Sequence, residues 1–288
     1  MSQPTGVIHD IGYRHYDGPR LGRGGAAVAL GVHSLRGTFG LGRTFKSKIM
    51  PFLLFGAMML PAVVSIAIMA LLKQQPMRYP DYIVFMQPII AIFLAAQSPV
   101  LVAPDLRHKV IPLYLSRPIT IVDYIGAKLA AMIAALLILM VVPITVQFVG
   151  ELLIDMPGPP YTSDYLAALG TSVIGAVLLA SVGLTLASFT PRRGLGVASV
   201  IAFYMFTLAA SAVLSGVFMS EGYSGAAQWS ILINPFFLIN AVQTNLFGTQ
   251  PVYGDAYPAG AGPILLVVAV VALALAAIYA RYRKALAA

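Results

Sequence analysis

The chain has 288 residues, of which 59% are hydrophobic and only 10% are charged. About a quarter of the residues in a soluble domain are charged, so the composition excludes an ordinary soluble protein. Cysteine is absent, which excludes disulfides and cysteine-ligated metal sites. The formal net charge is +8. The cations flank apolar segments, as described below, which indicates a membrane surface and no nucleic-acid partner.

Residues 1–23 are polar and contain several glycines and prolines. They lack the apolar core of a signal peptide. Two histidines and two aspartates lie in this segment, namely His9, Asp10, His15 and Asp17. Their spacing fits no regular metal-ligand pattern, so we interpret the segment as an exposed cytoplasmic strap.

Residues 24–48 mix apolar and basic side chains in a pattern typical of a helix lying in the membrane interface. The apolar side chains are Val28, Leu30, Leu35, Phe39, Leu41 and Phe45, and the basic ones are Arg36, Arg43, Lys46 and Lys48. The sequence predicts one cytoplasmic interfacial helix over residues 24–48, although its glycines weaken it.

Residues Gly37–Thr44 differ from a phosphate-binding loop, G-x-x-x-x-G-K-[ST], only in that Arg43 replaces the lysine. The loop chemistry needs that lysine and a preceding β-strand, and no strand-like run precedes Gly37. We interpret the match as accidental. We therefore expect no catalytic site, no ATP hydrolysis by this chain and no cofactor in it.

Six stretches of 22 to 27 residues contain no Asp, Glu, Lys or Arg. They are Ile49–Leu72, Tyr82–Pro104, Leu129–Gly150, Tyr165–Pro191, Gly194–Ser220 and Ala256–Ala280. An α-helix needs about 20 residues to cross the hydrocarbon core, and these stretches show no polar face. The sequence predicts an all-α integral membrane protein with six spans in residues 49–288.

The cations predict the orientation of these spans. One side receives 16 of the 18 Lys and Arg residues, and only Lys73 and Arg78 lie on the other. The positive-inside rule then places both termini in the cytoplasm, with the basic face against anionic lipid.

The fourth stretch contains small residues at helical spacing, which allow close approach of another helix. These are Gly175, Ala176, Ala180, Ser181 and Gly183. Two interpretations stay open, namely packing within the chain and a contact between two chains.

Residues Gly222–Gly254 are also free of charge, but their apolar part is short and is interrupted by Asn234 and Pro235. A crossing here would place the C-terminal cations outside, against the charge bias. We predict a re-entrant helical hairpin in the outer leaflet, over residues 222–254.

No charged residue lies near the middle of a predicted span, which disfavours an ion-coupled carrier. All four histidines lie in segments predicted to be cytoplasmic, and no metal site is expected. The polar side chains left in the spans include Gln87, Gln97 and Gln147. Such glutamines commonly form hydrogen bonds between helices, and the alternative is that they line a substrate path.

The cytoplasmic connection of residues 104–118 joins the second and third spans. Its first part is charged and its second part is apolar. The candidate contact residues are Asp105, Arg107, His108, Lys109, Leu113, Tyr114 and Leu115. A short loop projecting from two adjacent spans suits transmission of force from a soluble motor protein.

These motifs, in this order, resemble the permease subunits of ABC exporters of the type-two permease family. Leu113-Tyr114-Leu115-Ser116-Arg117-Pro118 is similar to the turn that precedes the third span, with Lys128 one turn into that span and Asp105 at the start of the loop. The Asn-Pro-aromatic motif of the outer hairpin corresponds to Asn234, Pro235 and Phe236. The resemblance covers roughly residues 25–285, and Asp105–Lys109 departs from the usual acidic front of the loop.

The resemblance implies a bacterial plasma-membrane permease that works with a separate ABC ATPase subunit, which binds ATP and Mg. It also implies a second permease copy, identical or related. The loop of residues 104–118 would couple the ATPase to the spans, with Asp105, Arg107 and Lys109 orienting it. The cargo would be a hydrophobic or amphiphilic small molecule, drug, antibiotic or lipid.

Two alternatives remain open. The chain is a secondary carrier or channel, or it is a non-transporting membrane scaffold or an inactive partner permease. A partner ATPase and measured flux distinguish these alternatives from the exporter.

Overall fold

The computed structural model describes Gly12, Gly18 and residues 22–154, 156–190, 192–252 and 257–286. Every regular element in these residues is helical. The elements are α1 Arg23–Thr38, α2 Phe45–Leu72, the 3-10 turn η1 Tyr79–Asp81, α3 Tyr82–Phe85, α4 Gln87–Arg107, α5 Ile111–Leu115, α6 Ile121–Leu153, α7 Thr162–Phe189, α8 Arg193–Ser220, α9 Ser224–Ile231, α10 Pro235–Phe247 and α11 Gly262–Leu286. Most of the predicted N-terminal strap, with His9, Asp10, His15 and Asp17, lies outside the described residues.

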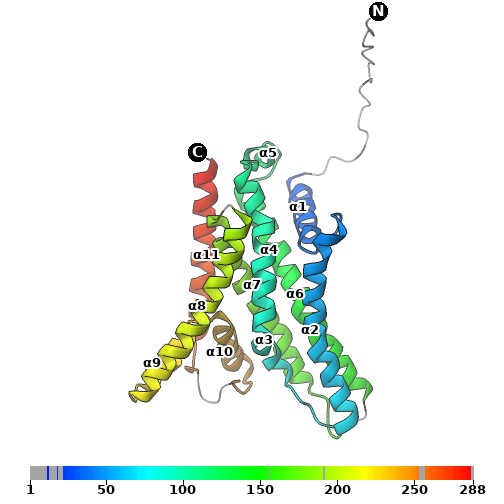
Figure 1. The fold of residues 1–288 in the computed structure, drawn as a ribbon, viewed down its shortest axis with the longest axis vertical. Coiled ribbons are helices and arrows are strands. Elements are labelled where there is room, and N and C mark those ends of the chain that lie inside the picture. The colour runs from blue at the N-terminus through cyan, green and yellow to red at the C-terminus, as the bar shows by residue number, and fades with distance from the viewer. Residues whose placement is uncertain are drawn as a thin grey trace, which may run out of the picture.

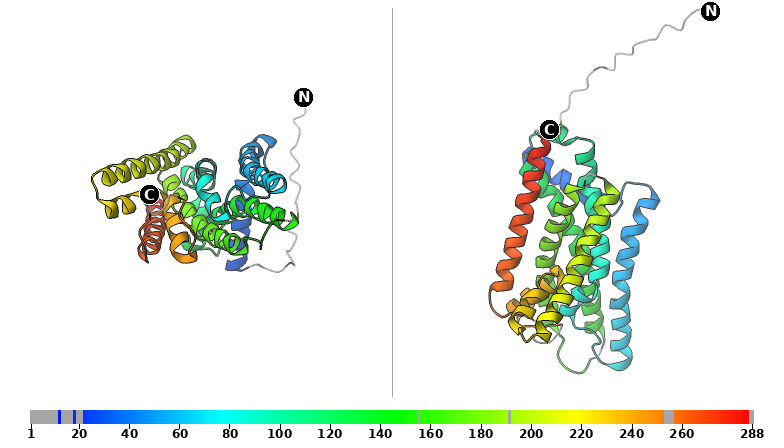
Figure 2. Two further views of the ribbon diagram at one scale, coloured as in Figure 1. Left: turned by 90° about the horizontal axis from the view of Figure 1, so that it is seen from below. Right: turned by 60° about the vertical axis from the view of Figure 1, so that its left-hand side comes forward.

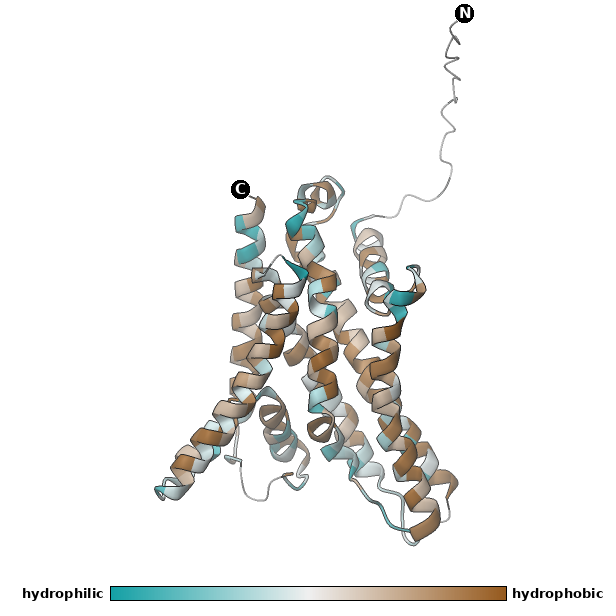
Figure 3. Cartoon of the chain, viewed as in Figure 1, coloured by the Kyte–Doolittle hydropathy of each residue, from teal (hydrophilic) through white to brown (hydrophobic). Residues whose placement is uncertain are grey.

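Six helices in the described ranges are long and apolar enough to cross a membrane, namely α2, α4, α6, α7, α8 and α11. They form a bundle (Figure 1). Apolar residues cover the middle of the helices and polar residues gather toward both ends (Figure 3). The chain is thus built as a multi-pass membrane protein, as the sequence predicts.

The two ends of the bundle differ. We call the end that carries α1, α5 and the last turns of α11 the terminal end (Figure 1). The opposite end, with η1, α9 and α10, is the distal end. Figure 2 shows the same division from a second side.

Several predicted spans differ from the helices in their limits, and residues 82–104 are divided between α3 and α4. The third stretch, residues 129–150, lies within the longer helix α6, which includes the charged residues Asp123, Lys128 and Glu151. Each of these has a polar partner, as described below, so the helix can include it. The last stretch, residues 256–280, is displaced, because α11 begins at Gly262 and ends at Leu286.

The prediction of one helix over residues 24–48 is wrong. The chain leaves the helix after Thr38, and α2 begins at Phe45. Gly40 and Gly42 have φ angles of 67° and 83°, which favour glycine. A Cβ at Gly40 would lie 2.5 Å from the carbonyl oxygen of Ser47. The stretch that resembles a phosphate-binding loop therefore includes the turn between two helices.

The small residues of α7 pack within the chain, so the first of the two interpretations is confirmed. A Cβ at Gly183 would lie 2.8 Å from Cγ of Leu94 in α4. A Cβ at Gly175 would lie 3.3 Å from Cδ1 of Ile239 in α10. Helix α7 is therefore the centre of the bundle, whereas α2, α8 and α11 expose large apolar side chains such as Leu53, Phe206 and Leu273.

Helices α9 and α10 form a bent pair at the distal end. They are bent by 111° across a short break. The break ends at Asn234, whose extended backbone is the conformation that a following proline favours. With 8 and 13 residues, neither helix crosses a membrane alone.

Candidate functional site

The predicted loop of residues 104–118 is largely helical. Residues Pro104–Arg107 are the last turn of α4, and α5 follows after a turn in which Lys109 has a φ of 52°. This left-handed conformation is uncommon for a residue other than glycine. It reverses the chain sharply, so α5 lies over the terminal end of the bundle (Figure 1).

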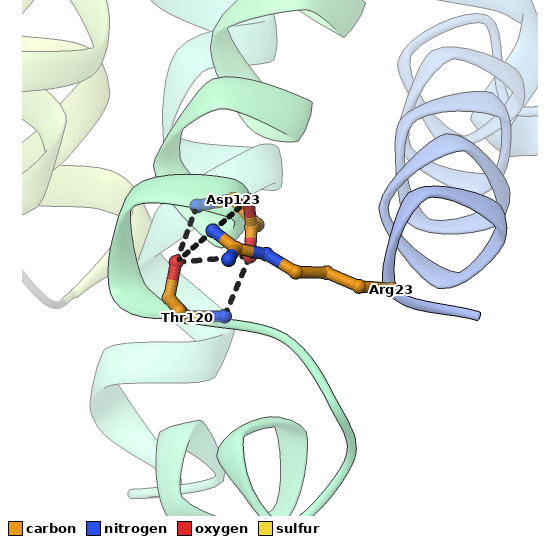
Figure 4. Close-up of polar contacts among 3 residues, drawn as sticks. All are labelled: Arg23, Thr120 and Asp123. Carbon is orange, nitrogen blue, oxygen red and sulfur yellow. Dashed lines mark hydrogen bonds and ion pairs between the residues drawn. The ribbon is translucent and has the colours of Figure 1, made fainter.

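The start of α6 is fixed by a capping box. The Thr120 hydroxyl accepts a hydrogen bond from the N–H of Asp123, and the Asp123 carboxylate accepts one from the N–H of Thr120 at 2.7 Å. Arg23 adds two bonds to the same carboxylate, at 2.7 and 3.0 Å (Figure 4). Arg23 is the first residue of α1, and it thereby joins α1 to the first turn of α6.

A mostly buried ion pair lies beneath α5. The Lys128 ammonium is 3.0 Å from a carboxylate oxygen of Asp105. The Tyr124 hydroxyl donates a hydrogen bond to that same carboxylate oxygen. Asp105 thus has two partners on α6, which offset the cost of removing its charge from water.

Three tyrosine rings continue this cluster. The rings of Tyr114 and Tyr124 have centroids 5.4 Å apart, and those of Tyr124 and Tyr282 are 5.3 Å apart. Both distances are typical of favourable aromatic pairs. Since the rings belong to α5, α6 and α11, they connect the short helix to two of the long ones. We call Asp105, Lys128, Tyr114, Tyr124 and Tyr282 the α5 cluster.

The structure divides the predicted contact residues into two groups. Arg107, His108 and Lys109 are exposed, and Leu113 is 70% exposed. Asp105, Tyr114 and Leu115 are partly buried.

Two of the partly buried residues differ from expectation. Asp105 was expected to be a contact residue of the loop, but its carboxylate binds Lys128 and Tyr124 within the bundle. Tyr114 packs inward, and burial raises the pKa of its phenol.

The three glutamines have different surroundings. Gln87 accepts a hydrogen bond from the side chain of Asn234 at 3.3 Å. Gln147 donates to the carbonyl of Met77 at 3.2 Å. Gln97 lies ten residues after Gln87, about 15 Å further along α4. Two of the three thus form the bonds between segments that glutamines in spans commonly make.

The Asn-Pro-Phe motif has a structural role at the start of α10. The Asn234 side chain accepts a hydrogen bond from the N–H of Phe236 at 2.9 Å and so caps the helix. Pro235 occupies the first turn, where its missing N–H costs nothing. Phe236 is buried. With the bond to Gln87, the motif fixes α10 against α4.

A second polar cluster lies at the distal end, and sequence reasoning missed it. Glu151 is 3% exposed and accepts hydrogen bonds from the Tyr79 hydroxyl and from the N–H of Tyr161, the latter at 2.9 Å. Burial raises the pKa of the Tyr79 phenol. Arg78 lies 3.5 Å from Asp164. Sequence spacing gives no signal for a contact between residues 79 and 151.

No metal-binding group of three or more His, Asp or Glu side chains occurs in the described part of the chain. No family model matches the sequence, and neither a curated protein nor a solved structure is significantly similar to it.

Proposed function

We propose that the chain is the permease subunit of an ATP-driven exporter, with a separate ABC ATPase as its partner and a second permease copy beside it. In this proposal the terminal end faces the cytoplasm, α1 lies in the inner membrane interface and the bent pair α9–α10 is a re-entrant outer hairpin. The cargo is a hydrophobic or amphiphilic small molecule.

One observation carries the proposal, namely the placement of α5. It lies over the terminal end of the bundle (Figure 1). Its Leu113 is exposed, and the exposed cations Arg107 and Lys109 precede it in the chain. An exposed leucine that follows exposed cations in the chain suits a protein contact, because burial of the leucine is favourable and the charges select the partner.

The α5 cluster gives such a contact a mechanical consequence. A push on α5 is transmitted through the Tyr114 ring to Tyr124 and through Asp105 to Lys128. The first contact acts on α6, and the second joins α4 to α6. Both helices are therefore expected to move together when the partner ATPase closes on ATP.

The experiment is co-expression of the chain with an ABC ATPase encoded by a neighbouring gene, followed by purification and reconstitution into liposomes. We expect a stable complex whose ATPase activity depends on the permease. Leu113→Asp is expected to abolish the complex or the coupled activity. Leu153→Asp, at an 82% exposed leucine of the distal end, is the matched control and is expected to retain both.

Two results would overturn the proposal. One is the absence of any complex with an ABC ATPase, and the other is equal activity of Leu113→Asp and the unmodified chain. Flux through the purified chain without an ATPase would instead identify a carrier or channel.

A further inference from the structure

A polar pocket lies at the terminal end, separate from the α5 cluster. It is formed by the first turns of α2 and α8 and by the second half of α4, and it has a volume of about 270 Å³. Its polar lining residues are Arg43, Lys46, Ser47, Gln97 and Arg193. Three cations thus line one small cavity.

The chain brings these cations together through its turns. The glycine turn before α2 places Arg43 against α1, since a Cβ at Gly37 would lie 3.6 Å from an Nη atom of Arg43. Lys46 is in the first turn of α2, and Arg193 is the first residue of α8. The N-termini of both helices add partial positive charge to the same region.

The positive charge in the pocket has no acidic counterpart in the described residues. Among the described residues, the carboxylates of the terminal end are Asp105 and Asp123, and these bind Lys128 and Arg23. No ion pair joins Arg43, Lys46 or Arg193 to a described carboxylate. Like charges held close together repel, so an anion entering the pocket would relieve this repulsion.

A buried amide faces the same cavity. Gln97 is only 5% exposed, lines the pocket and forms no side-chain hydrogen bond to another described residue. A ligand that offers hydrogen-bonding oxygens would satisfy Gln97 as well as the cations.

We propose that this pocket binds a phosphate group, which has the charge and the oxygen atoms that the lining residues require. Two sources share this chemistry, an anionic lipid headgroup and a soluble phosphate. Met50 lines the pocket, and Phe45 at the start of α2 is 77% exposed. The apolar side chains next to the cations are suited to an acyl chain, and basic pockets between membrane helices are known to bind lipid headgroups. The proposal does not depend on the exporter function.

The test uses the full chain in nanodiscs and compares the double variant Lys46→Gln/Arg193→Gln with Lys48→Gln/Arg192→Gln. The control removes the same charge from neighbouring residues that do not line the pocket. One arm measures binding of phosphatidylglycerol against phosphatidylcholine by native mass spectrometry. The other arm titrates inorganic phosphate against chloride at equal ionic strength and follows the thermal midpoint.

We expect the pocket variant to lose about tenfold or more in affinity and the control to stay within about threefold, because charge-assisted hydrogen bonds are lost only in the first. Preference for phosphatidylglycerol alone identifies a lipid site, and a response to inorganic phosphate identifies a soluble ligand. Gln97→Leu keeps every cation and is expected to weaken binding in the same arm, even if the double variant fails to fold. Equal losses in the two double variants, or no preference for either phosphate source, would overturn the proposal.

Discussion

Asp105 and Lys128 form an ion pair of 3.0 Å that joins the last turn of α4 to the second turn of α6. Both side chains are mostly buried, and Tyr124 donates a second bond to Asp105. The pair therefore makes the two helices that carry α5 into one unit. The pair lies next to the contacts that α5 makes with the bundle through Ile111, Tyr114 and Leu115.

Lys128→Met is expected to lower the free energy of unfolding by about 2–4 kcal/mol, because it leaves the Asp105 carboxylate buried without its cation. Thermal unfolding of the purified chain in detergent measures the loss. The double variant Asp105→Asn/Lys128→Met removes both charges and is expected to recover most of the stability. A double variant that is less stable than Lys128→Met would show that the pair itself, and not the unpaired charge, determines the effect.

Tyr79→Phe tests the distal cluster. The variant removes one hydrogen bond to the buried Glu151 carboxylate, so we expect a loss of about 1–3 kcal/mol in the free energy of unfolding. Tyr223→Phe, at a 65% exposed tyrosine of the same end, is the control and is expected to change it by less than about 0.5 kcal/mol. Equal effects of the two substitutions would show that the Tyr79 hydroxyl does not stabilise the Glu151 carboxylate.

Asp81 makes the stability of the distal end dependent on pH. Burial raises the pKa of its carboxyl, and the charge of Asp164 adds to the effect against the attraction of Arg78. The pKa of Asp81 is thus higher in the folded state than in the unfolded state. The free energy of unfolding therefore falls as the pH rises through the interval between these two pKa values. Asp81→Asn is therefore expected to raise the thermal midpoint at about pH 7.5 and to have less effect near pH 4.

Asp164→Asn is the control for Asp81→Asn. It removes the partner of Arg78 and is expected to lower the midpoint at neutral pH or leave it unchanged. A lower midpoint for Asp81→Asn at about pH 7.5 would contradict a destabilising charge on Asp81.

The existence of the six long helices follows from the sequence, because runs free of charge and of more than 20 residues have one stable arrangement in lipid. The limits of the helices do not follow so directly. Lys128 and Glu151 lie inside α6 because Asp105 and Tyr79 approach them in space. Runs defined by the absence of charge end before such residues.

Contacts between residues that are distant in the sequence also explain which features of the candidate site the sequence did not predict. Asp105 and Lys128 are recognisable as polar residues at the ends of spans, but only the turn at Lys109 and the start of α6 bring them together. The apolar second part of the loop is sufficient to indicate Leu113 as a contact residue. The inward position of Tyr114 depends on a ring from α6, which no local pattern reveals. At Gly40 and Gly42, the sequence indicated only that glycines weaken the predicted helix over residues 24–48. It did not predict that the chain turns there.

The proposed orientation can be tested with single cysteines, because the chain has no native cysteine. Ser116 is exposed at the terminal end, and Ser163 is exposed at the distal end. The positive-inside rule places Ser116 in the cytoplasm. In intact cells, an impermeant thiol reagent is therefore expected to label Ser163→Cys and not Ser116→Cys. Both are expected to react after the membrane is permeabilised.

The same assay decides whether the bent pair α9–α10 crosses the membrane. Ser224 and Gln250 flank the pair and are exposed. If the pair is re-entrant, cysteines at both positions are labelled from outside, together with Ser163→Cys. Labelling of Ser224→Cys without Gln250→Cys in intact cells would instead make the pair a seventh span. The C-terminal end of α11 would then lie outside, where Arg281, Arg283 and Lys284 conflict with the charge bias that sets topology.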